Sequence, residues 1–536
     1  MTRSAHVDMF VQEHLPPADQ WPEFIFETPE LQFPERLNAA VELLDQAVAE
    51  GHGPRQAIIG ANTHWTYQQL QDKVNRIARV LVDDMGLVPG NRVLLRGANS
   101  PMLAACWLAV LKAGGVAVGT MPLLRAKELK DIIRIAQVSH ALCADTLVEE
   151  LDIAREHSPG LTHCLTFGAD DAGLESRASA KTPEFAAVDT AAEDPALIAF
   201  TSGTTGIPKG TVHFHRDVLA MCEVFPRHCL KPSQDDVFIG TPPLAFTFGL
   251  GGLLCFPLWA RASTVLLEKL APEPLLQAIQ DYRATICFTS PTAYRAMAAL
   301  VPDYDIRSLA KCVSAGEALP TDTRDKWRAA TGIEIHDGIG GTEVIHIYMG
   351  SGPEDYRPGA LGRMLPGYRG MIVDDDMNPL PQGEVGRLAI KGPTGCRYLS
   401  DERQKNYVKN GWNIPGDAFH VDADGYYYYH ARIDDMIVSS GYNISSPEVE
   451  WALLAHPAVA ECGVTGVPDD ARGQIVKAFV VLKPEFEAGD GLAAELQDFV
   501  KRTVAPYKYP RAIRFVESLP RTETGKLQRF RLRDMP

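Results

Sequence analysis

The feature that most constrains this chain is one short run rich in glycine and hydroxyl side chains, Thr201-Ser202-Gly203-Thr204-Thr205-Gly206-Ile207-Pro208-Lys209-Gly210. The residues before it, 194–200, read as a turn followed by a buried strand. Glycine lets the backbone approach an oxyanion closely, successive backbone N–H groups in such a turn form an anion-binding nest, and Lys209 adds a mobile positive charge. Because α/β folds place phosphates at the carboxyl ends of strands, the run predicts a phosphate site in an α/β fold.

Two other interpretations of this run are less favoured. A flexible surface connector would not need so many hydroxyl groups beside a lysine. A Walker A loop is excluded, because the spacing GxxxxGKS or GxxxxGKT is absent and Gly210 follows Lys209. The sequence therefore argues against an ordinary nucleotide-hydrolysing switch, which needs that loop.

Size, charge and cysteine usage set further limits. With 536 residues the chain is too long for one ordinary core, and its 46% hydrophobic and 22% charged residues are typical of a soluble globular protein. The net charge of −16 argues against nonspecific binding of nucleic acid, so any polyanion must be received by local positive sites. The 10 cysteines show no CxxC pair, and several lie in apolar runs (Cys106, Cys255, Cys287), which predicts packed thiols and a reducing compartment.

The N-terminal region carries Asp8 and Glu13 and has no apolar stretch, so we expect no signal peptide. Residues 101–124 are apolar, but Lys112 and a Gly-Gly pair interrupt them, and a helix followed by a strand fits better than a membrane span. We therefore expect a cytoplasmic protein without a membrane or nucleic-acid partner. The sequence leaves the oligomeric state open, and a homodimer is one state that it allows.

Apolar periodicity predicts βαβ units in the first part of the chain. Apolar residues recur at helical spacing within residues 66–84, and a strand follows at 92–95. A helix capped at Ser100 runs to Lys112, and the next strand lies at 116–118. Strands that alternate with helices in this way are typical of a parallel sheet.

The middle of the chain continues the pattern and then changes. Strand-like segments at 285–288, 311–314 and 334–335 alternate with helical stretches. Residues 357–430 are broken by Gly, Pro and Asp into short segments, which favours a β-rich subdomain.

We place a domain boundary at residue 432. A helix with a capping-box pattern begins at Ser445-Ser446-Pro447-Glu448, and a strand at 478–482 and a helix at 491–504 follow. The predicted fold is therefore α/β, with a large N-terminal domain of βαβ-type sheets plus the β-rich subdomain (residues 1–431), followed by a small α+β C-terminal domain (residues 432–536).

Further motifs follow the first run in order: Gly338-Ile339-Gly340-Gly341-Thr342-Glu343, Gly411-Trp412-Asn413-Ile414-Pro415-Gly416-Asp417, Ala431-Arg432-Ile433-Asp434-Asp435 and Pro520-Arg521-Thr522-Glu523-Thr524-Gly525-Lys526. Together they span most of the chain and resemble the adenylate-forming superfamily, which includes acyl-CoA and aryl-CoA synthetases, nonribosomal adenylation domains and firefly luciferase. The resemblance implies an AMP-binding N-terminal domain and a C-terminal domain that turns as a mobile lid between two half-reactions.

In the first half-reaction implied by the resemblance, a carboxylate attacks the α-phosphorus of ATP and pyrophosphate leaves. Lys209 would act catalytically beside the phosphate-binding residues of the run, which are Thr201, Ser202, Gly203, Thr204 and Thr205. Glu343 is a hard oxygen ligand suited to Mg²⁺, and the resemblance assigns it with Thr201 to the metal and Thr342 to the nucleotide. Without its motif, Glu343 would read as a solvated loop glutamate.

The resemblance also implies where adenine binds. Gly316, Glu317 and Ala318 follow a strand, and their small neighbours suit close approach of the backbone to a flat base. We expect adenine there, packed beside Gly338 and Ile339.

The remaining nucleotide and CoA contacts come from the later motifs. By resemblance, Asp417 accepts hydrogen bonds from the ribose hydroxyls, Arg432 helps to bind the nucleotide, and Lys526 reaches both the reacting carboxylate and the α-phosphate. Asp434 is the implied hinge, and Gly441 would let the pantetheine of CoA pass close to the backbone. Taken alone, the two aspartates read as turn residues, and Lys526 reads as a solvated lysine near a terminus.

The predicted acid pocket depends on residues 242–252 and 343–348, which look most like those of benzoate-CoA and 2-aminobenzoate-CoA ligases. A flat aryl acid prefers aromatic and apolar walls with few polar groups. The resemblance assigns these residues to the pocket: Phe246, Phe248, Gly340 and His346. Ordinary core packing is the alternative interpretation of the two phenylalanines.

We therefore predict an ATP-dependent aryl-CoA ligase that uses ATP, Mg²⁺ and coenzyme A. It would convert an aromatic carboxylate, benzoate or 2-aminobenzoate, to its CoA thioester and release AMP and pyrophosphate. A medium-chain or other arylalkanoate acyl-CoA synthetase is the main alternative. A carrier-loading adenylation domain is less favoured because this chain shows no carrier domain, and the intact Glu343, Asp417 and Lys526 argue against a non-catalytic AMP-binding sensor.

Overall fold

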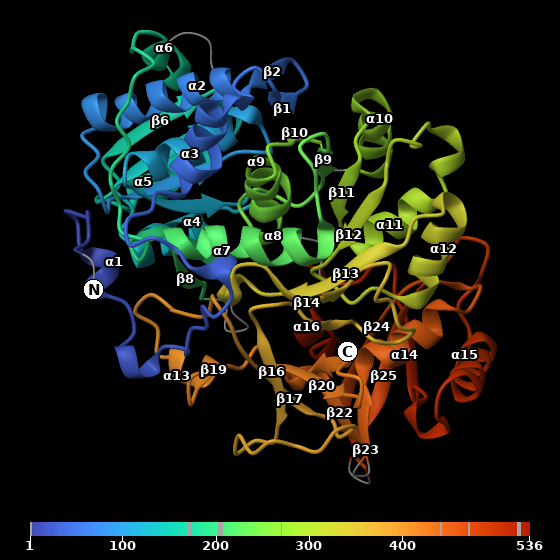
Figure 1. The fold of residues 1–536 in the computed structure, drawn as a ribbon. Coiled ribbons are helices and arrows are strands. Elements are labelled where there is room, and N and C mark those ends of the chain that lie inside the picture. Colours follow the sequence, from blue (N-terminus) through green and yellow to red (C-terminus); the bar gives the residue numbers. More distant parts are fainter. Residues whose placement is uncertain are drawn as a thin grey trace.

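Two mostly parallel sheets with helices packed against them make up the larger part of the molecule (Figure 1). The computed structural model describes residues 3–168, 173–201, 207–269, 271–439, 442–469, 472–521 and 527–535. The α/β fold class, with a large N-terminal and a small C-terminal region, is confirmed.

The first sheet has the strand order β6-β5-β3-β4-β7-β8, and its only antiparallel pair in the described residues is β7 with β8. Its strands are β3 (Arg92–Arg96), β4 (Val116–Thr120), β5 (His140–Ala144), β6 (His163–Phe167), β7 (Pro195–Thr201) and β8 (Lys209–Phe214). The helices of this part are α1 (Phe10–Glu13), α2 (Tyr67–Arg79), α3 (Pro101–Lys112), α4 (Ala126–Ala136), α5 (Val148–Glu156), α6 (Leu174–Ser179) and α7 (His215–Phe225).

Local sequence explains why these helices begin where they do. Thr66 and Gln69 form a capping box at the start of α2, with Gln69 N donating to Thr66 Oγ1 at 3.2 Å and Thr66 N donating to Gln69 Oε1 at 2.9 Å. Ser100 caps α3 by accepting from Leu103 N at 3.2 Å, and Pro101 occupies the first turn. Both predicted helices are confirmed, and α3 begins at the cap that the sequence predicted.

The second sheet has nine strands in the order β15-β14-β13-β12-β11-β9-β10-β1-β2, and the six strands from β13 to β1 are parallel. Its strands are β1 (Gln56–Gly60), β2 (Thr63–Thr66), β9 (Val237–Gly240), β10 (Ser263–Val265), β11 (Ile286–Thr289), β12 (Lys311–Ser314), β13 (Ile335–Gly340), β14 (Ile347–Ser351) and β15 (Arg363–Met364). Its helices are α8 (Thr247–Leu250), α9 (Phe256–Trp259), α10 (Pro272–Tyr282), α11 (Pro291–Ala298) and α12 (Thr321–Thr331). One large hydrophobic core runs through both sheets and the helices between them.

The region predicted to be β-rich, residues 357–430, contains an antiparallel sheet. Its strands are β16 (Arg369–Val373), β17 (Gly386–Lys391), β18 (Val408–Lys409), β19 (Trp412–Asn413), β20 (Asp417–Val421) and β21 (Tyr427–Arg432), with the helix α13 (Gln404–Tyr407).

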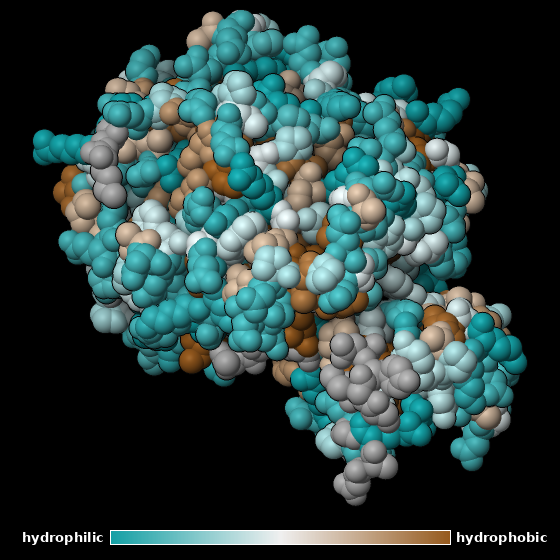
Figure 2. Space-filling view, turned by 60° about the horizontal axis from the view of Figure 1, so that its bottom comes forward, coloured by the Kyte–Doolittle hydropathy of each residue, from teal (hydrophilic) through white to brown (hydrophobic). Residues whose placement is uncertain are grey.

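The C-terminal region has a sheet and a hydrophobic core of its own. The strands are β22 (Met436–Ser439), β23 (Tyr442–Ser445), β24 (Val459–Asp469), β25 (Gly473–Leu482) and β26 (Ala512–Phe515), and the helices are α14 (Ser446–Leu454), α15 (Asp490–Thr503) and α16 (Arg529–Arg533). Figure 2 shows this region as a smaller lobe on the main body, with a largely hydrophilic surface.

Short helical segments complete the described structure. The 3₁₀ turns are η1 (Ala18–Gln20), η2 (Pro29–Leu31), η6 (Asp145–Leu147), η9 (Val301–Asp303), η10 (Thr342–Val344), η11 (Ile433–Asp435) and η12 (Pro506–Lys508), and the π-helical segments are η3 (Val41–Asp45), η4 (Val48–His52), η5 (Val80–Asp84), η7 (Pro226–Leu230) and η8 (Gly251–Cys255). In the part of the chain that the structure describes, no helix combines the length and the apolar character that a bilayer span requires.

Candidate active site

The glycine- and hydroxyl-rich run connects the antiparallel strands β7 and β8. Lys209 is the first residue of β8 and lies opposite Thr201, the last residue of β7. The buried Thr201 Oγ1 has no hydrogen-bond partner among the described residues. The predicted phosphate residues Ser202, Gly203, Thr204 and Thr205 lie outside the described residues.

Lys209 and Glu343, which the sequence assigns to different motifs, lie side by side. Lys209 Nζ is 3.7 Å from Glu343 Oε1, and Tyr398 Oη lies beside this ion pair within hydrogen-bond distance of both atoms. The ammonium donates to Tyr398 Oη at 2.8 Å, and the phenol donates to Glu343 Oε1 at 2.6 Å. Burial and the nearby Glu343 carboxylate raise the pKa of Tyr398, so the phenol keeps its proton.

A buried charge cluster supports the turn that carries Glu343. His213 Nε2 donates to the Thr342 carbonyl at 2.7 Å, and its Nδ1 is 3.6 Å from Asp217 Oδ2. Asp217 forms an ion pair with Arg397. The side chains of His213, Asp217 and Arg397 are fully buried. Burial alone would raise the pKa of Asp217, but Arg397 and His213 bring it below its usual value.

Sequence reasoning missed Tyr398, His213 and Arg397. A usable signal exists for one of them, because Arg397 is the single charged residue between Lys391 and Asp401. A lone arginine in an uncharged stretch of a buried subdomain must find a carboxylate partner.

The chain reverses direction sharply between Glu343 and His346. Ile345 has φ 66° and ψ −42°, and His346 N donates to the Val344 carbonyl at 2.9 Å, which defines a γ-turn with positive φ. A buried β-branched residue with this φ is strained. The turn separates the polar surroundings of Glu343 from the apolar surroundings of His346.

His346 is enclosed by aromatic rings. Its ring centroid lies 6.0 Å from that of Phe225, 5.7 Å from Phe248 and 4.5 Å from Phe256. Burial lowers the pKa of His346 to about 3, so the imidazole is neutral at physiological pH. Its Nε2 is 3.4 Å from the Phe248 carbonyl oxygen, and its buried Nδ1 has no hydrogen-bond partner among the described residues.

Two glycines allow this arrangement. A Cβ at Gly251 would lie 2.5 Å from the His346 ring, and a Cβ at Gly340 would lie 2.5 Å from the His346 carbonyl oxygen. Phe248 also packs on Phe288 at 5.7 Å. The sequence assigns Phe246 to the same pocket, but its ring makes no ring–ring contact in the described structure. Phe246 directly precedes α8, and its carbonyl accepts a hydrogen bond from Leu250 N at 2.8 Å.

The residues expected near adenine lie on two adjacent strands. β12 and β13 are parallel, and Ser314 pairs with Asp337, so the segments 314–318 and 338–340 leave the same edge of the sheet. Gly316 has φ +91°, and Glu317 Oε2 accepts from Thr292 Oγ1 at 3.1 Å. Burial raises the pKa of Asp337 to about 6, although Arg324 opposes the shift. Ala318 and Ile339 are half-buried.

Asp417 and Arg432, predicted separately to bind the nucleotide, form an ion pair. Asp417 opens β20 and pairs in register with Arg432, which ends β21, and Arg432 Nη1 donates to Asp417 Oδ1 at 3.1 Å. The Asp417 side chain is 6% exposed and that of Arg432 is 52% exposed. The fixed carboxylate therefore lies beneath a cation at the surface.

The contacts around residue 434 divide between the two regions. Ile433 N donates to the Gly416 carbonyl at 2.9 Å, which ties Ile433 to the antiparallel sheet. Asp435 is tied to the C-terminal region, because its carbonyl accepts from Ser446 Oγ at 2.8 Å and its carboxylate pairs with Arg533 at 3.2 Å. The predicted Gly441 and Lys526 lie outside the described residues.

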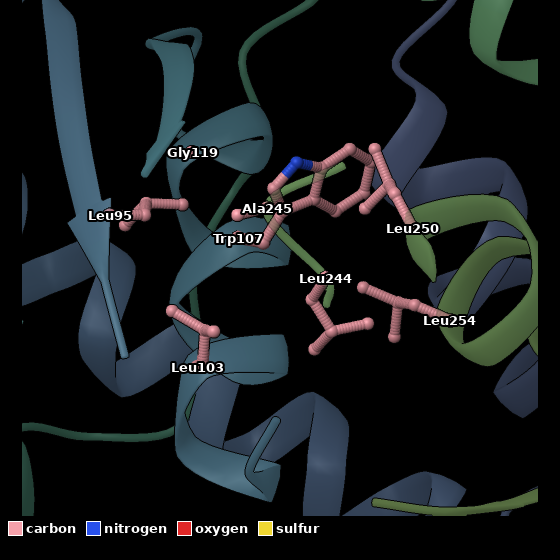
Figure 3. A pocket seen from close by; sticks show the side chains of 8 residues that line it. All are labelled: Leu95, Leu103, Trp107, Gly119, Leu244, Ala245, Leu250 and Leu254. Carbon is pink, nitrogen blue, oxygen red and sulfur yellow. The ribbon is translucent and has the colours of Figure 1, made fainter. Parts of the chain in front are cut away.

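An apolar cavity of about 20 Å³ is lined in part by the segment that leads into α8 (Figure 3). It is lined by Leu95, Leu103, Trp107, Gly119, Leu244, Ala245, Leu250 and Leu254. None of the predicted acid-pocket residues lines it. A cavity of this size has room for about one water, but the lining offers almost no polar partner. The cavity is therefore a gap in the packing of the apolar core and not a ligand site.

The chain matches two family models. The model described as AMP-binding enzyme matches residues 45–398, and the model described as AMP-binding enzyme C-terminal domain matches residues 448–526.

Relatives in other organisms are similar along nearly the whole chain. The chain is 35% identical over 512 residues to the benzoate–CoA ligase of Thauera aromatica, covering 94% of this chain and 97% of that protein. It is 33% identical over 530 residues to the mitochondrial acyl-coenzyme A synthetase ACSM5 of Homo sapiens, covering 93% and 90%. The crystal structure of the anthranilate CoA ligase AuaEII in complex with anthranoyl-AMP is similar with a TM-score of 0.90 and 33% identity, covering 95% and 98%.

Proposed function

The chain belongs to the AMP-binding enzyme family, and on that premise we propose that it is an ATP-dependent aryl-CoA ligase whose acid is benzoate or 2-aminobenzoate. It is an acid–thiol ligase of the adenylate-forming superfamily, because the family match covers most of the chain and its relatives are CoA ligases. ATP, a small carboxylic acid and CoA are the substrates that fit this class.

The ring cluster around His346 is the observation that carries the aromatic assignment. Walls of aromatic rings with few polar atoms suit a flat aryl acid. If Nε2 donates to the Phe248 carbonyl, the unpartnered Nδ1 of His346 is an acceptor, and an amino group on the acid is a donor that would satisfy it. The likeness to an anthranilate CoA ligase solved with anthranoyl-AMP supports the same class of acid.

The proposed reaction has two balanced steps. A carboxylate oxygen of the acid attacks the α-phosphorus of ATP, and the bond to the bridging oxygen breaks as pyrophosphate leaves. The thiol of CoA, after loss of its proton, then attacks the carbonyl carbon of the aryl-adenylate, and AMP leaves. Lys209 would hold phosphate charge in the first step, and the Asp417–Arg432 pair would hold the ribose and the nucleotide.

The residues at the phosphate site fit a magnesium ion. Glu343 Oε1 accepts from Tyr398, whereas Oε2 accepts no hydrogen bond in the described structure, and Thr201 Oγ1 is a buried hydroxyl without a partner there. These two oxygens are the hard ligands that Mg²⁺ prefers. A bound Mg²⁺ would neutralise phosphate charge as pyrophosphate departs.

We also propose that residues 432–536 form the mobile lid and that Asp434 is its hinge. Ile433 is bonded to the large region and Asp435 to the small one, so a rotation that keeps both sets of contacts must occur at residue 434. Lys526 would serve the first step and Gly441 the passage of pantetheine, as their motifs predict.

A medium-chain acyl-CoA synthetase is the second candidate, because the chain is 33% identical to ACSM5. The deciding experiment measures pyrophosphate release and CoA thioester formation across benzoate, substituted benzoates, arylalkanoates and C6–C10 fatty acids, with and without CoA. We expect the highest kcat/KM for benzoate or 2-aminobenzoate. Activity confined to the fatty acids would remove the aryl assignment, and release of phosphate in place of pyrophosphate would remove adenylation.

A further inference from the structure

Tyr398 occupies a position that none of the sequence motifs explains. Its Oη accepts a hydrogen bond from Lys209 at 2.8 Å and donates one to Glu343 at 2.6 Å, while the two charged groups stay 3.7 Å apart. We propose that Tyr398 is a positioning residue that holds Lys209 and Glu343 as an ion pair at 3.7 Å, beyond direct hydrogen-bond contact, and so keeps both charges available to Mg·ATP. The inference rests on the proposed ATP-dependent function.

The hydroxyl of Tyr398 bonds both charged groups, because it donates to Glu343 and accepts from Lys209. The Tyr398 side chain is fully buried. A neutral hydroxyl donates once and accepts as well, so it can bond an ammonium and a carboxylate at the same time. Without this hydroxyl, the ion pair between the two charged groups would shorten from 3.7 Å to a direct charge-assisted hydrogen bond.

The phenol is fixed relative to Lys209 because both belong to one hydrogen-bonded unit. On either side of Tyr398, Leu399 N donates to the Gly210 carbonyl at 2.8 Å and Val212 N donates to the Arg397 carbonyl at 2.8 Å. These bonds fasten Tyr398 to β8, the strand that Lys209 begins.

Glu343 is fixed by its backbone from other directions. His213 donates to the Thr342 carbonyl at 2.7 Å, and Thr394 Oγ1 donates to the Val344 carbonyl at 2.8 Å. Because the backbone on both sides of Glu343 is held, the freedom left to its carboxylate is mainly side-chain rotation. Tyr398 is the group that controls this rotation.

The test compares Tyr398→Phe with Tyr67→Phe in the full chain. Tyr67 is a matched control, because it is also fully buried and its hydroxyl also makes a hydrogen bond, to the Ala262 carbonyl at 2.8 Å, but it lies outside the proposed site. Calorimetric titration with Mg·ATP should show about tenfold weaker binding for Tyr398→Phe, as expected for loss of a charge-assisted hydrogen bond. Tyr67→Phe should bind Mg·ATP as the wild type does.

A double-mutant cycle separates positioning from general stability. In a Glu343→Gln background the ion pair cannot form, so adding Tyr398→Phe should weaken Mg·ATP binding less than twofold further. Thioester formation from preformed aryl-AMP and CoA should stay at the wild-type rate in Tyr398→Phe.

Three results would overturn the inference: wild-type affinity in Tyr398→Phe, an equal loss in Tyr67→Phe, or a full tenfold loss that persists in the Glu343→Gln background. A different result would refute the proposed function. If the wild-type protein binds Mg·ATP but makes no thioester from any acid, the ligase assignment is wrong, whereas the effect of Tyr398→Phe on Mg·ATP binding can still be measured.

Discussion

At the scale of single residues, the account depends most on Glu343. Glu343→Gln keeps an oxygen that can accept from Tyr398 but removes the anionic charge proposed to meet the metal. We expect a loss of about 2–4 kcal/mol of transition-state stabilisation in acid-dependent pyrophosphate release, with an altered Mg²⁺ dependence and an unchanged melting temperature. The exposed Glu354→Gln removes the same charge elsewhere and is the control. Full activity with the normal Mg²⁺ dependence would defeat the assignment.

His346 gives a residue-scale prediction about stability. Its pKa falls from 6.5 in the unfolded chain to about 3 in the folded protein, so below pH 6.5 the unfolded state binds the extra proton. The contribution of His346 to stability is therefore complete above pH 6.5 and is lost as the pH falls toward 3. Between pH 7 and pH 5, denaturant unfolding of the wild type should lose about 2 kcal/mol more than that of His346→Phe. Equal losses in the two proteins would show that His346 is not buried in its neutral form.

At the scale of elements, the contact between η8 and the ring cluster sets the shape of the proposed acid pocket. Gly251→Ala would place a methyl group 2.5 Å from the His346 ring, so the ring must move. We expect the ratio of kcat/KM values among substituted benzoates to change severalfold while KM for ATP stays constant. Gly160→Ala is the control, because a Cβ there meets no atom within 4 Å. A drop in ATP binding with flat acid selectivity would mean that the pocket has been misplaced.

The helices and strands also show which features could be predicted from the sequence. The apolar periodicity of residues 66–84 and the Ser100–Pro101 start signal are local, and the structure confirms both helices. The Lys209–Tyr398 and Glu343–Tyr398 contacts join residues 189 and 55 positions apart, so only the tertiary fold brings them together. The γ-turn at Ile345 could not be predicted from the sequence either, because a β-branched residue rarely adopts a positive φ.

At the scale of the whole molecule, the proposed lid separates two half-reactions. Lys526→Ala should reduce adenylation by about 10²–10³-fold, as for loss of one preorganised donor, and leave thioester formation from preformed aryl-AMP nearly normal. Asp434→Pro should do the reverse, because proline fixes the backbone at the one residue between the two sets of contacts. Equal loss of both half-reactions in a folded Lys526→Ala protein would remove the support for a rotating lid.

The central claim is that the acid is activated as an acyl-adenylate, and oxygen transfer tests it most directly. Benzoate or 2-aminobenzoate labelled with ¹⁸O in the carboxylate is turned over with ATP and CoA, and the AMP, pyrophosphate and any phosphate are analysed by mass spectrometry. Because the attacking carboxylate oxygen stays on the α-phosphorus when the thiol displaces AMP, the account predicts one ¹⁸O atom in AMP and none in pyrophosphate. Label in inorganic phosphate, or AMP without label, would contradict it.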